Sequence, residues 1–310
     1  MKRYLLFFAL LAIMPLTVGA QSFRVSVGRS ADIGRGFVLY VYDTDSMPRV
    51  LKPEGNKKGQ VTFAGTVRGA VYAELRHPNV SSPLPFFLEN SDISINFNPK
   101  DPEQSHITGS RQNSVVRYQL EQCGEMDAGC LAQFVTENPS SPVAPFILER
   151  YVMPASDLET TIKLYGMLSG EACKAWHYRH LGSRLKVRSM LADGEKLPTL
   201  TYADKQGRVV RIDTLVDANR WNVIAIGASF CRQCKTVVDT IAMSMPELKS
   251  IVVDIDNLTG GWDAPLLQQL DADHIPYLVL IAPDRRIAAR DARVWELKRI
   301  IGHDNRRSKQ

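Results

Sequence analysis

One apolar run that ends in two cysteines constrains the fold of this chain more than any other stretch. Residues 224–234 read IAIGASFCRQC, so Cys231 and Cys234 are separated by two residues. From Cys234 onward, apolar residues recur with helical spacing as far as Met245. The pattern predicts a buried strand, a sharp turn and a helix, with Cys231 at the turn.

A cysteine at the start of a helix is reactive for a physical reason. The helix N-terminus offers unpaired backbone N–H groups and the positive end of the helix dipole, and both stabilise a thiolate. Cys234 follows within the first turn and can close a small disulfide with Cys231. We interpret the pair as a dithiol/disulfide redox centre. Two alternatives stay open: half of a zinc site, although the sequence has no second C-x-x-C pair, and a structural disulfide without catalysis.

The first 20 residues have the pattern of a signal peptide. Lys2 and Arg3 precede an apolar stretch over residues 4–16, and the small residues Val18, Gly19 and Ala20 follow. The apolar run is too short to span a bilayer comfortably, which argues against a stable membrane anchor. We expect cleavage after Ala20 and export of a soluble chain, with the periplasm as its location.

The charge of the chain argues against nucleic acid as a partner. The formal net charge is +5 over 310 residues, and loss of Lys2 and Arg3 with the leader lowers it to +3. The remaining basic residues are scattered along the chain and form no concentrated patch.

Changes in hydrophobic period divide the chain after the leader into three regions. Residues 22–110 contain short runs of β-branched and aromatic residues, and we expect a β-rich, antiparallel N-terminal domain. Residues 111–192 have amphipathic helical spacing and form a helical connecting region. Residues 194–303 alternate strand and helix patterns, which predicts an α/β sheet with helices on both faces.

Three further cysteines lie in the helical region. Cys123 and Cys130 can pair in an oxidising compartment, and two buried free thiols are the alternative. Cys173, His177 and His180 would share one helix face at i, i+4 and i+7, but three ligands without a fourth are a weak metal signal. We therefore expect no metal and no bound cofactor.

The motif and its surroundings resemble a known family. Residues 227–234, GASFCRQC, are similar to the active-site segment of thioredoxin-fold proteins, and residues 274–281, HIPYLVLI, to the segment that carries their cis-proline. With the leader, the resemblance points to the extracytoplasmic TlpA/ResA-like thiol–disulfide oxidoreductases. Residues 22–110 resemble the β-rich domain of unknown function often fused ahead of such thioredoxins, through FLEN at 87–90 and TGS at 108–110.

The resemblance implies roles for individual residues. Cys231 would be the attacking thiolate and Cys234 the resolving thiol. Pro276, if cis, would present the backbone of Ile275 to a substrate chain. The residues beside Cys231, Phe230 and Arg232, would contact the substrate.

The sequence departs from the family pattern at several positions. Phe230 stands where tryptophan is common, and Arg232 should favour the Cys231 thiolate. The buried carboxylate of thioredoxin is replaced by Ala225, and the glutamate frequent after the second cysteine by Val237. The sequence therefore assigns no proton acceptor for the resolving thiol.

The resemblance implies an exported thiol–disulfide oxidoreductase whose partners are protein thiols or disulfides and an upstream membrane or periplasmic redox protein. A cell-envelope binding or assembly module with a redox-inactive thioredoxin fold is the main alternative. A peroxidase is a third possibility, but Ala228 occupies the position three before Cys231 where such enzymes carry threonine.

Overall fold

The computed structural model describes residues 22–307, apart from 29–35, 44–46, 55–60 and 125. The predicted leader and its cleavage after Ala20 lie outside the described residues. The chain divides into two compact units, one with residues up to Val152 and 168–178, the other with residues 153–167 and those from Arg179 on. The finer division at residues 110, 192 and 194 stays a prediction.

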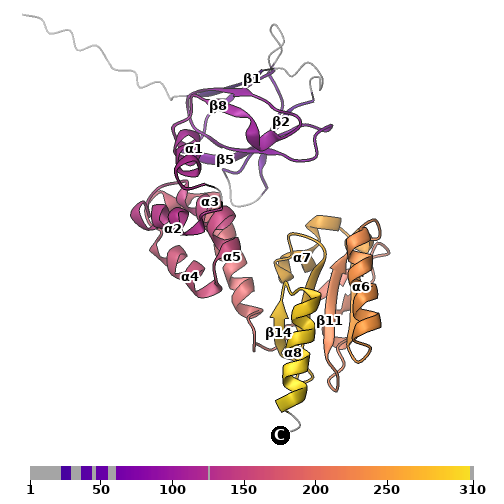
Figure 1. The fold of residues 1–310 in the computed structure, drawn as a ribbon. Coiled ribbons are helices and arrows are strands. Elements are labelled where there is room, and N and C mark those ends of the chain that lie inside the picture. Colours follow the sequence, from indigo (N-terminus) through magenta and orange to yellow (C-terminus); the bar gives the residue numbers. More distant parts are fainter. Residues whose placement is uncertain (1–21, 29–35, 44–46, 55–60, 125, 308–310) are drawn as a thin grey trace, which may run out of the picture. The chain divides into compact units, whose positions relative to one another are not determined.

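The β-rich part of the first unit consists of two four-stranded sheets (Figure 1). One has the order β4-β1-β7-β8 and the other β3-β2-β5-β6. The strands are β1 (Phe23–Gly28), β2 (Val38–Val41), β3 (Arg49–Leu51), β4 (Val61–Gly65), β5 (Val71–Arg76), β6 (Leu84–Leu88), β7 (Asp92–Asn96) and β8 (His106–Thr108).

Alternating burial explains why these segments form a packed sheet. In β1 the side chains of Phe23, Val25 and Val27 are fully buried, while the residues between them reach solvent. The expectation of a purely antiparallel domain is wrong at one pair, because β1 and β7 are parallel. A parallel pair needs a long crossover, and the whole stretch from β2 to β6 provides it.

The helical elements are α1 (Arg111–Cys123), α2 (Ala128–Glu137), α3 (Ala144–Ile147), α4 (Leu158–Met167) and α5 (Trp176–Met190). The Ser110 side chain caps α1 by accepting a hydrogen bond from the backbone N–H of Asn113. A disulfide joins Cys123 at the end of α1 to Cys130 in α2. The pairing left open by the sequence is therefore present.

The predicted helix face with Cys173, His177 and His180 is wrong. Cys173 lies in a separate 3-10 turn (Ala172–Lys174), because Ala175 is extended and α5 begins only at Trp176. His177 Nδ1 lies 2.8 Å from Glu149 Oε2 in the interior of the first unit.

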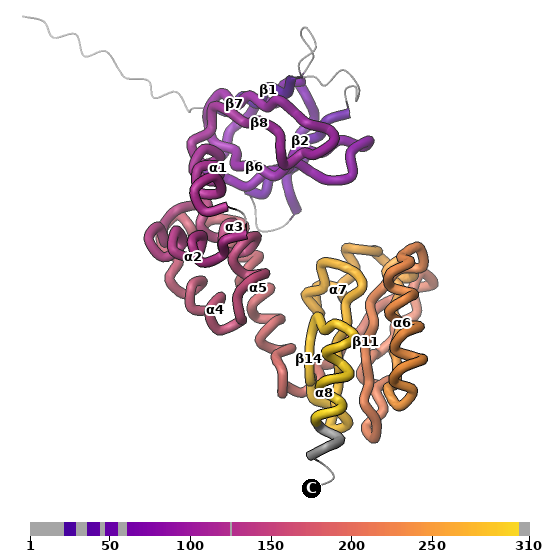
Figure 2. Tube along the Cα trace, viewed as in Figure 1, coloured from indigo at the N-terminus to yellow at the C-terminus, as the bar shows by residue number. Residues whose placement is uncertain are grey.

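The second unit has one four-stranded sheet with the order β12-β11-β13-β14 (Figures 1 and 2). β11 and β12 are parallel, whereas β13 is antiparallel to β11 and β14. The strands are β11 (Asn222–Gly227), β12 (Lys249–Asp254), β13 (Tyr277–Ile281) and β14 (Ile287–Arg290), and the helices are α6 (Arg232–Ser244), α7 (Pro265–Leu270) and α8 (Val294–Arg307). A short hairpin, β9 (Thr201–Ala203) with β10 (Val209–Arg211), precedes the sheet.

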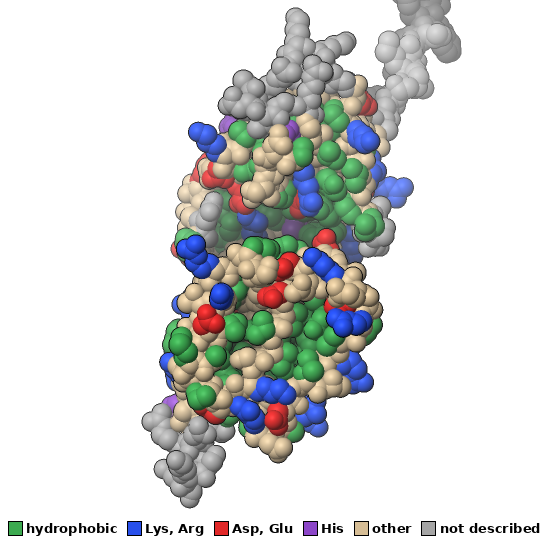
Figure 3. Space-filling model, turned by 90° about the vertical axis from the view of Figure 1, so that its right-hand side faces the viewer, with side chains coloured by type: hydrophobic (Ala, Val, Ile, Leu, Met, Phe, Trp, Pro, Cys, Tyr) green, Lys and Arg blue, Asp and Glu red, His purple; other side chains and the backbone are tan. Residues whose placement is uncertain are grey.

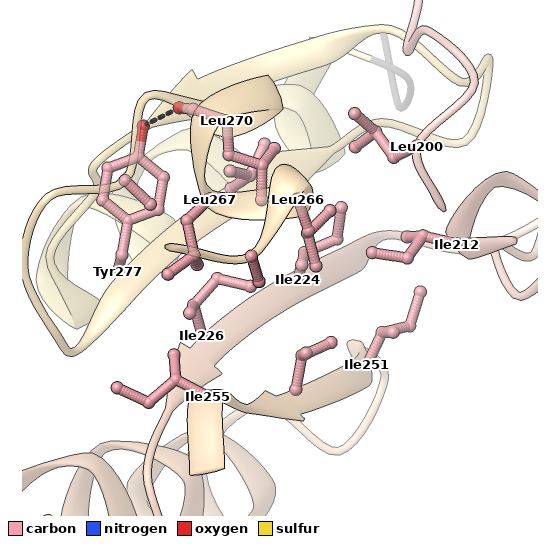
Figure 4. Packing of buried hydrophobic residues seen from close by; sticks show 14 of the residues in the cluster. Leu200, Ile212, Ile224, Ile226, Ile251, Ile255, Leu266, Leu267, Leu270 and Tyr277 are labelled. Carbon is pink, nitrogen blue, oxygen red and sulfur yellow. Dashed lines mark hydrogen bonds between the residues drawn. The ribbon is translucent and has the colours of Figure 1, made fainter. Parts of the chain in front are cut away.

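The sheet is covered on both faces, as the sequence predicts. Ile224 and Ile226 of β11 pack with Leu267 of α7 on one face (Figure 4). Val223 and Ala225 pack on the other face in a second core, which includes Ile241 of α6 and Leu297 of α8. Fully burying a Leu or Ile side chain stabilises a fold by about 1.5–3 kcal/mol. Two such cores hold the central strand β11 rigidly beneath the cysteine motif.

The strand order, strand directions and helix positions are those of a thioredoxin-like domain. The predicted fold class is confirmed: an α/β thioredoxin-like C-terminal domain, preceded by β-rich and helical regions. Within the described part of the chain, no helix is both long and apolar enough to cross a membrane.

Candidate redox site

The cysteine motif lies where β11 ends and α6 begins. All six residues of β11 are buried, so the strand fixes the position of the turn that follows it. Cys231 is the N-cap residue of α6, and its Sγ accepts a hydrogen bond of 3.1 Å from the backbone N–H of Cys234. The two cysteines form a disulfide with a Cα–Cα distance of 5.3 Å.

The two sulfurs differ in their access to solvent. Cys231 is partly exposed, whereas Cys234 is only 5% exposed. The accessible cysteine is also the one at the helix N-terminus, where a thiolate is best stabilised. This asymmetry is what an attacking thiol and an internal resolving thiol require.

The predicted proline segment lies beside the motif. The peptide bond between Ile275 and Pro276 is cis. The side chain of Ile275 packs against the same core cluster as Cys231, and Pro276 lines the same hollow as Cys234. The structure thus brings together four residues that the sequence placed in one site.

The other two predicted site residues flank the motif at the surface. Phe230 is 74% exposed, and Arg232, the first residue of α6, is also exposed. Figure 3 shows hydrophobic side chains interspersed with both basic and acidic side chains on the surface of the molecule. Phe230 is an apolar contact available to a partner, next to the accessible sulfur.

Sequence reasoning missed a carboxylate that fixes the turn before Cys231. Asp256 Oδ1 accepts a hydrogen bond of 2.8 Å from the backbone N–H of Ser229, and Oδ2 accepts one of 2.7 Å from the Ser229 hydroxyl. These hydrogen bonds, above all that from the Ser229 hydroxyl, lower the pKa of Asp256. Ser229 and Asp256 are distant in sequence and meet only because β11 pairs with β12. No local sequence pattern predicts this contact.

A second carboxylate lies deeper in the site. Asp254 is the last residue of β12 and lines a hollow of about 240 Å³ together with Gly227, Cys234 and Pro276. Burial raises the pKa of Asp254, and the negative charge of Asp256 raises it further. The sequence places Asp254 at the end of a predicted strand, but the face to which it points depends on the strand register.

The described residues contain no group of three or more His, Cys, Asp or Glu side chains placed to hold a metal ion.

Comparison with known proteins gives one family model and several structural neighbours. The model described as Domain of unknown function (DUF4369) matches residues 35–116, within and just beyond the predicted β-rich domain. No curated protein matches the chain. A thioredoxin-like protein from Bacteroides caccae is 14% identical, with a TM-score of 0.41, over 62% of this chain and 83% of its own.

Two further neighbours resemble a smaller part of the chain. The thioredoxin domain of a thiol-disulfide oxidoreductase from Bacteroides vulgatus is 16% identical, with a TM-score of 0.28, over 36% of this chain and 97% of its own. A thiol:disulfide interchange protein from Bacteroides sp. is 16% identical, with a TM-score of 0.28, over 36% of this chain and 88% of its own.

These likenesses are distant, so the fold rests on the chain's own strand order and on the position of its cysteine pair. The second unit is a thioredoxin-like domain, and the β-rich region ahead of it matches a family model of unknown function.

Proposed function

We propose that the protein is an exported thiol–disulfide oxidoreductase that exchanges electrons with protein thiols and disulfides through Cys231 and Cys234. One observation carries the proposal: the pair joins an accessible sulfur at the start of α6 to a buried sulfur within the same helical turn. The predicted leader supports a periplasmic location. There, an upstream membrane or periplasmic redox protein would exchange electrons with the cysteine pair and so return it to its starting redox state.

The reaction with a client disulfide has two steps. The Cys231 thiolate attacks one client sulfur, forms a mixed disulfide and releases the other client sulfur as a thiolate. Cys234, as its thiolate, then attacks Cys231 Sγ and breaks the bond to the client. The Cys231–Cys234 disulfide closes, the client has gained two electrons, and its second sulfur leaves as a thiolate that takes up a proton. The same steps in reverse oxidise a client dithiol.

The surroundings of Cys231 suit a peptide client. Phe230 offers an apolar contact and Arg232 a positive charge on either side of the reacting sulfur. Ile275 and Pro276 lie next to the pair, where their backbone would guide an extended client chain.

The direct test is the reduction of insulin disulfides by the exported chain, residues 21–310, in the presence of a chemical reductant. We expect Cys231→Ser to abolish the acceleration and Cys173→Ser to leave it unchanged. Equal rates for the wild type and Cys231→Ser would refute the proposal. Mass spectrometry of the secreted or periplasmic fraction would test the predicted cleavage after Ala20.

The alternative is a binding module with an inactive redox pair. It draws support from a hollow of about 400 Å³ in the first unit, lined among others by Phe87, Leu120 and Phe146, which offers room for a ligand or peptide. A pulldown with Cys234→Ala separates the two functions. An oxidoreductase retains clients through mixed disulfides that a reductant releases, whereas a binding module retains partners that withstand it.

A further inference from the structure

We propose that Asp254 accepts the proton of the Cys234 thiol when Cys234 resolves the mixed disulfide. This inference rests on the proposed oxidoreductase function and names a residue for a step that the sequence left without one. The two positions at which the resemblance to thioredoxin-fold proteins would place a carboxylate hold Ala225 and Val237 here.

Strand register brings Asp254 to the face of the sheet that α6 covers. Asp254 pairs with Gly227 across the parallel strands β12 and β11. Ala225, two residues before Gly227, packs into the core beneath α6. Side chains two residues apart in a strand point to the same face. Asp254 therefore lies on the face that carries Cys234.

Gly227 leaves the space between the carboxylate and the sulfur open. A Cβ atom at this position would lie 3.6 Å from Cys234 Sγ and 3.7 Å from Asp254 Oδ1. Cys234 Cβ would be closer still, at 3.1 Å, so a side chain here would crowd the sulfur and the carboxylate, which both lie beside this point. The hollow of about 240 Å³ that the two groups line has room for water. A water molecule in this hollow can carry the proton from the thiol to the carboxylate.

Other charged groups lie around this hollow. Lys235 and Asp239 line it from α6, and Asp256 acts on Asp254 from the turn after β12. Burial, followed by the charge of Asp256, raises the pKa of Asp254. A carboxylate whose pKa is raised is a better acceptor for the proton of a thiol, whose ordinary pKa is about 8.5.

The Cys234 S–H bond breaks, its proton goes to the Asp254 carboxylate, and the electron pair stays on sulfur. The thiolate then attacks Cys231 Sγ, the Cys231–Cys234 bond forms, and the bond between Cys231 and the client sulfur breaks. The client sulfur leaves as a thiolate, and Asp254 later returns its proton to solvent.

Stopped-flow reaction of the reduced chain with 5,5′-dithiobis(2-nitrobenzoate) separates the two steps. The chain would carry Cys123→Ser, Cys130→Ser and Cys173→Ser, so that only the redox pair reacts. Attack by Cys231 releases the first thionitrobenzoate, and attack by Cys234 releases the second. The rate of each release is measured from about pH 5 to pH 9.

We expect Asp254→Asn to slow the second release at pH 7 by about tenfold or more, because general-base assistance is lost. Its rate should then rise about tenfold per pH unit up to the thiol pKa, whereas the wild-type rate flattens once Asp254 is ionised. The first release should stay within about twofold. Asp239→Asn, which removes a carboxylate from the same hollow, is the matched control and should leave both releases within about twofold.

The opposite result has a clear signature. Loss of a negative charge alone favours the Cys234 thiolate, so a purely electrostatic role predicts an equal or faster second release in Asp254→Asn. That outcome would overturn the inference while the first release still supports the proposed function. Absence of any rapid first release in the wild type would instead refute the function itself. Asp254→Glu retains the acid and should restore the wild-type pH profile; if Asn impairs folding and Glu folds without restoring the profile, the inference also fails.

Discussion

Replacement of Asp271 by Asn should destabilise the second unit strongly, because Asp271 anchors three arginines. Its side chain is 6% exposed, and its oxygens lie 2.5 Å from Arg184 Nε, 2.5 Å from Arg188 Nε and 3.6 Å from Arg290 Nη1. Asp271 has a φ of 50°, a conformation that Asn adopts readily. The substitution therefore removes the charge and leaves the backbone geometry in place.

The magnitude follows from what the substitution leaves behind. Removing one partner of a buried ion pair costs about 3–5 kcal/mol. The arginine side chains retain 16–22% exposure, and Arg184 keeps a second partner in Asp273 at 2.7 Å. Solvent and Asp273 offset part of the loss. We expect the free energy of unfolding of the second unit to fall by about 2–4 kcal/mol.

Urea unfolding followed by tryptophan fluorescence measures this loss, since Trp221, Trp262 and Trp295 all lie in the second unit. The control is Asp273→Asn, whose side chain is 60% exposed and whose ion pair with Arg184 should contribute at most about 1 kcal/mol. If Asp271→Asn costs no more than this control, the arginine cluster does not stabilise the fold as argued.

Two further predictions concern a disulfide and a histidine. Replacing Cys123 and Cys130 together by Ser should lower the stability of the first unit by about 2 kcal/mol, since a short cross-linked loop is freed; an unchanged urea midpoint would contradict this. His274 has hydrogen bonds to Asp273 and Asp291, and although burial lowers its pKa, these carboxylates raise it above 6.5 overall. The stabilisation of the folded state by protonated His274 is thus complete below about pH 6.5, and it is lost as the pH rises through the higher pKa that His274 has in the folded state. His274→Asn should cost under about 1 kcal/mol near pH 6 and nothing near pH 9, whereas a pH-independent difference would exclude the imidazolium as its source.

The parts of the fold that the sequence predicted are those fixed by local patterns. The run before Cys231 has the length and composition of a buried strand, and the apolar spacing after Cys234 has the helical period, so β11 and α6 follow directly. Strand β6 (Leu84–Leu88) is hard to predict from its sequence, because Pro85 weakens the strand pattern. It is tolerated because β6 lies at the edge of its sheet.

The missed parts of the site depend on contacts distant in sequence. Asp254 faces Cys234 only through its pairing with Gly227, and a shift of register by one residue would turn it to the other face. Ser229 and Asp256 likewise meet only across the ends of paired strands. His177, weighed as a metal ligand from its spacing, lies beside Glu149 because of tertiary packing that no helical period encodes.

The proposed function requires that Cys231 and Cys234 form a reversible redox couple. The most direct measurement is equilibration of residues 21–310 with glutathione buffers, with Cys123, Cys130 and Cys173 replaced by Ser and free thiols counted by alkylation and mass spectrometry. We predict one reversible two-electron transition in which both thiols disappear together, at a potential between about −270 and −120 mV, where the low end marks a reductant and the high end an oxidant. Thiols that stay reduced, or a disulfide that stays closed, across this whole range would contradict the account.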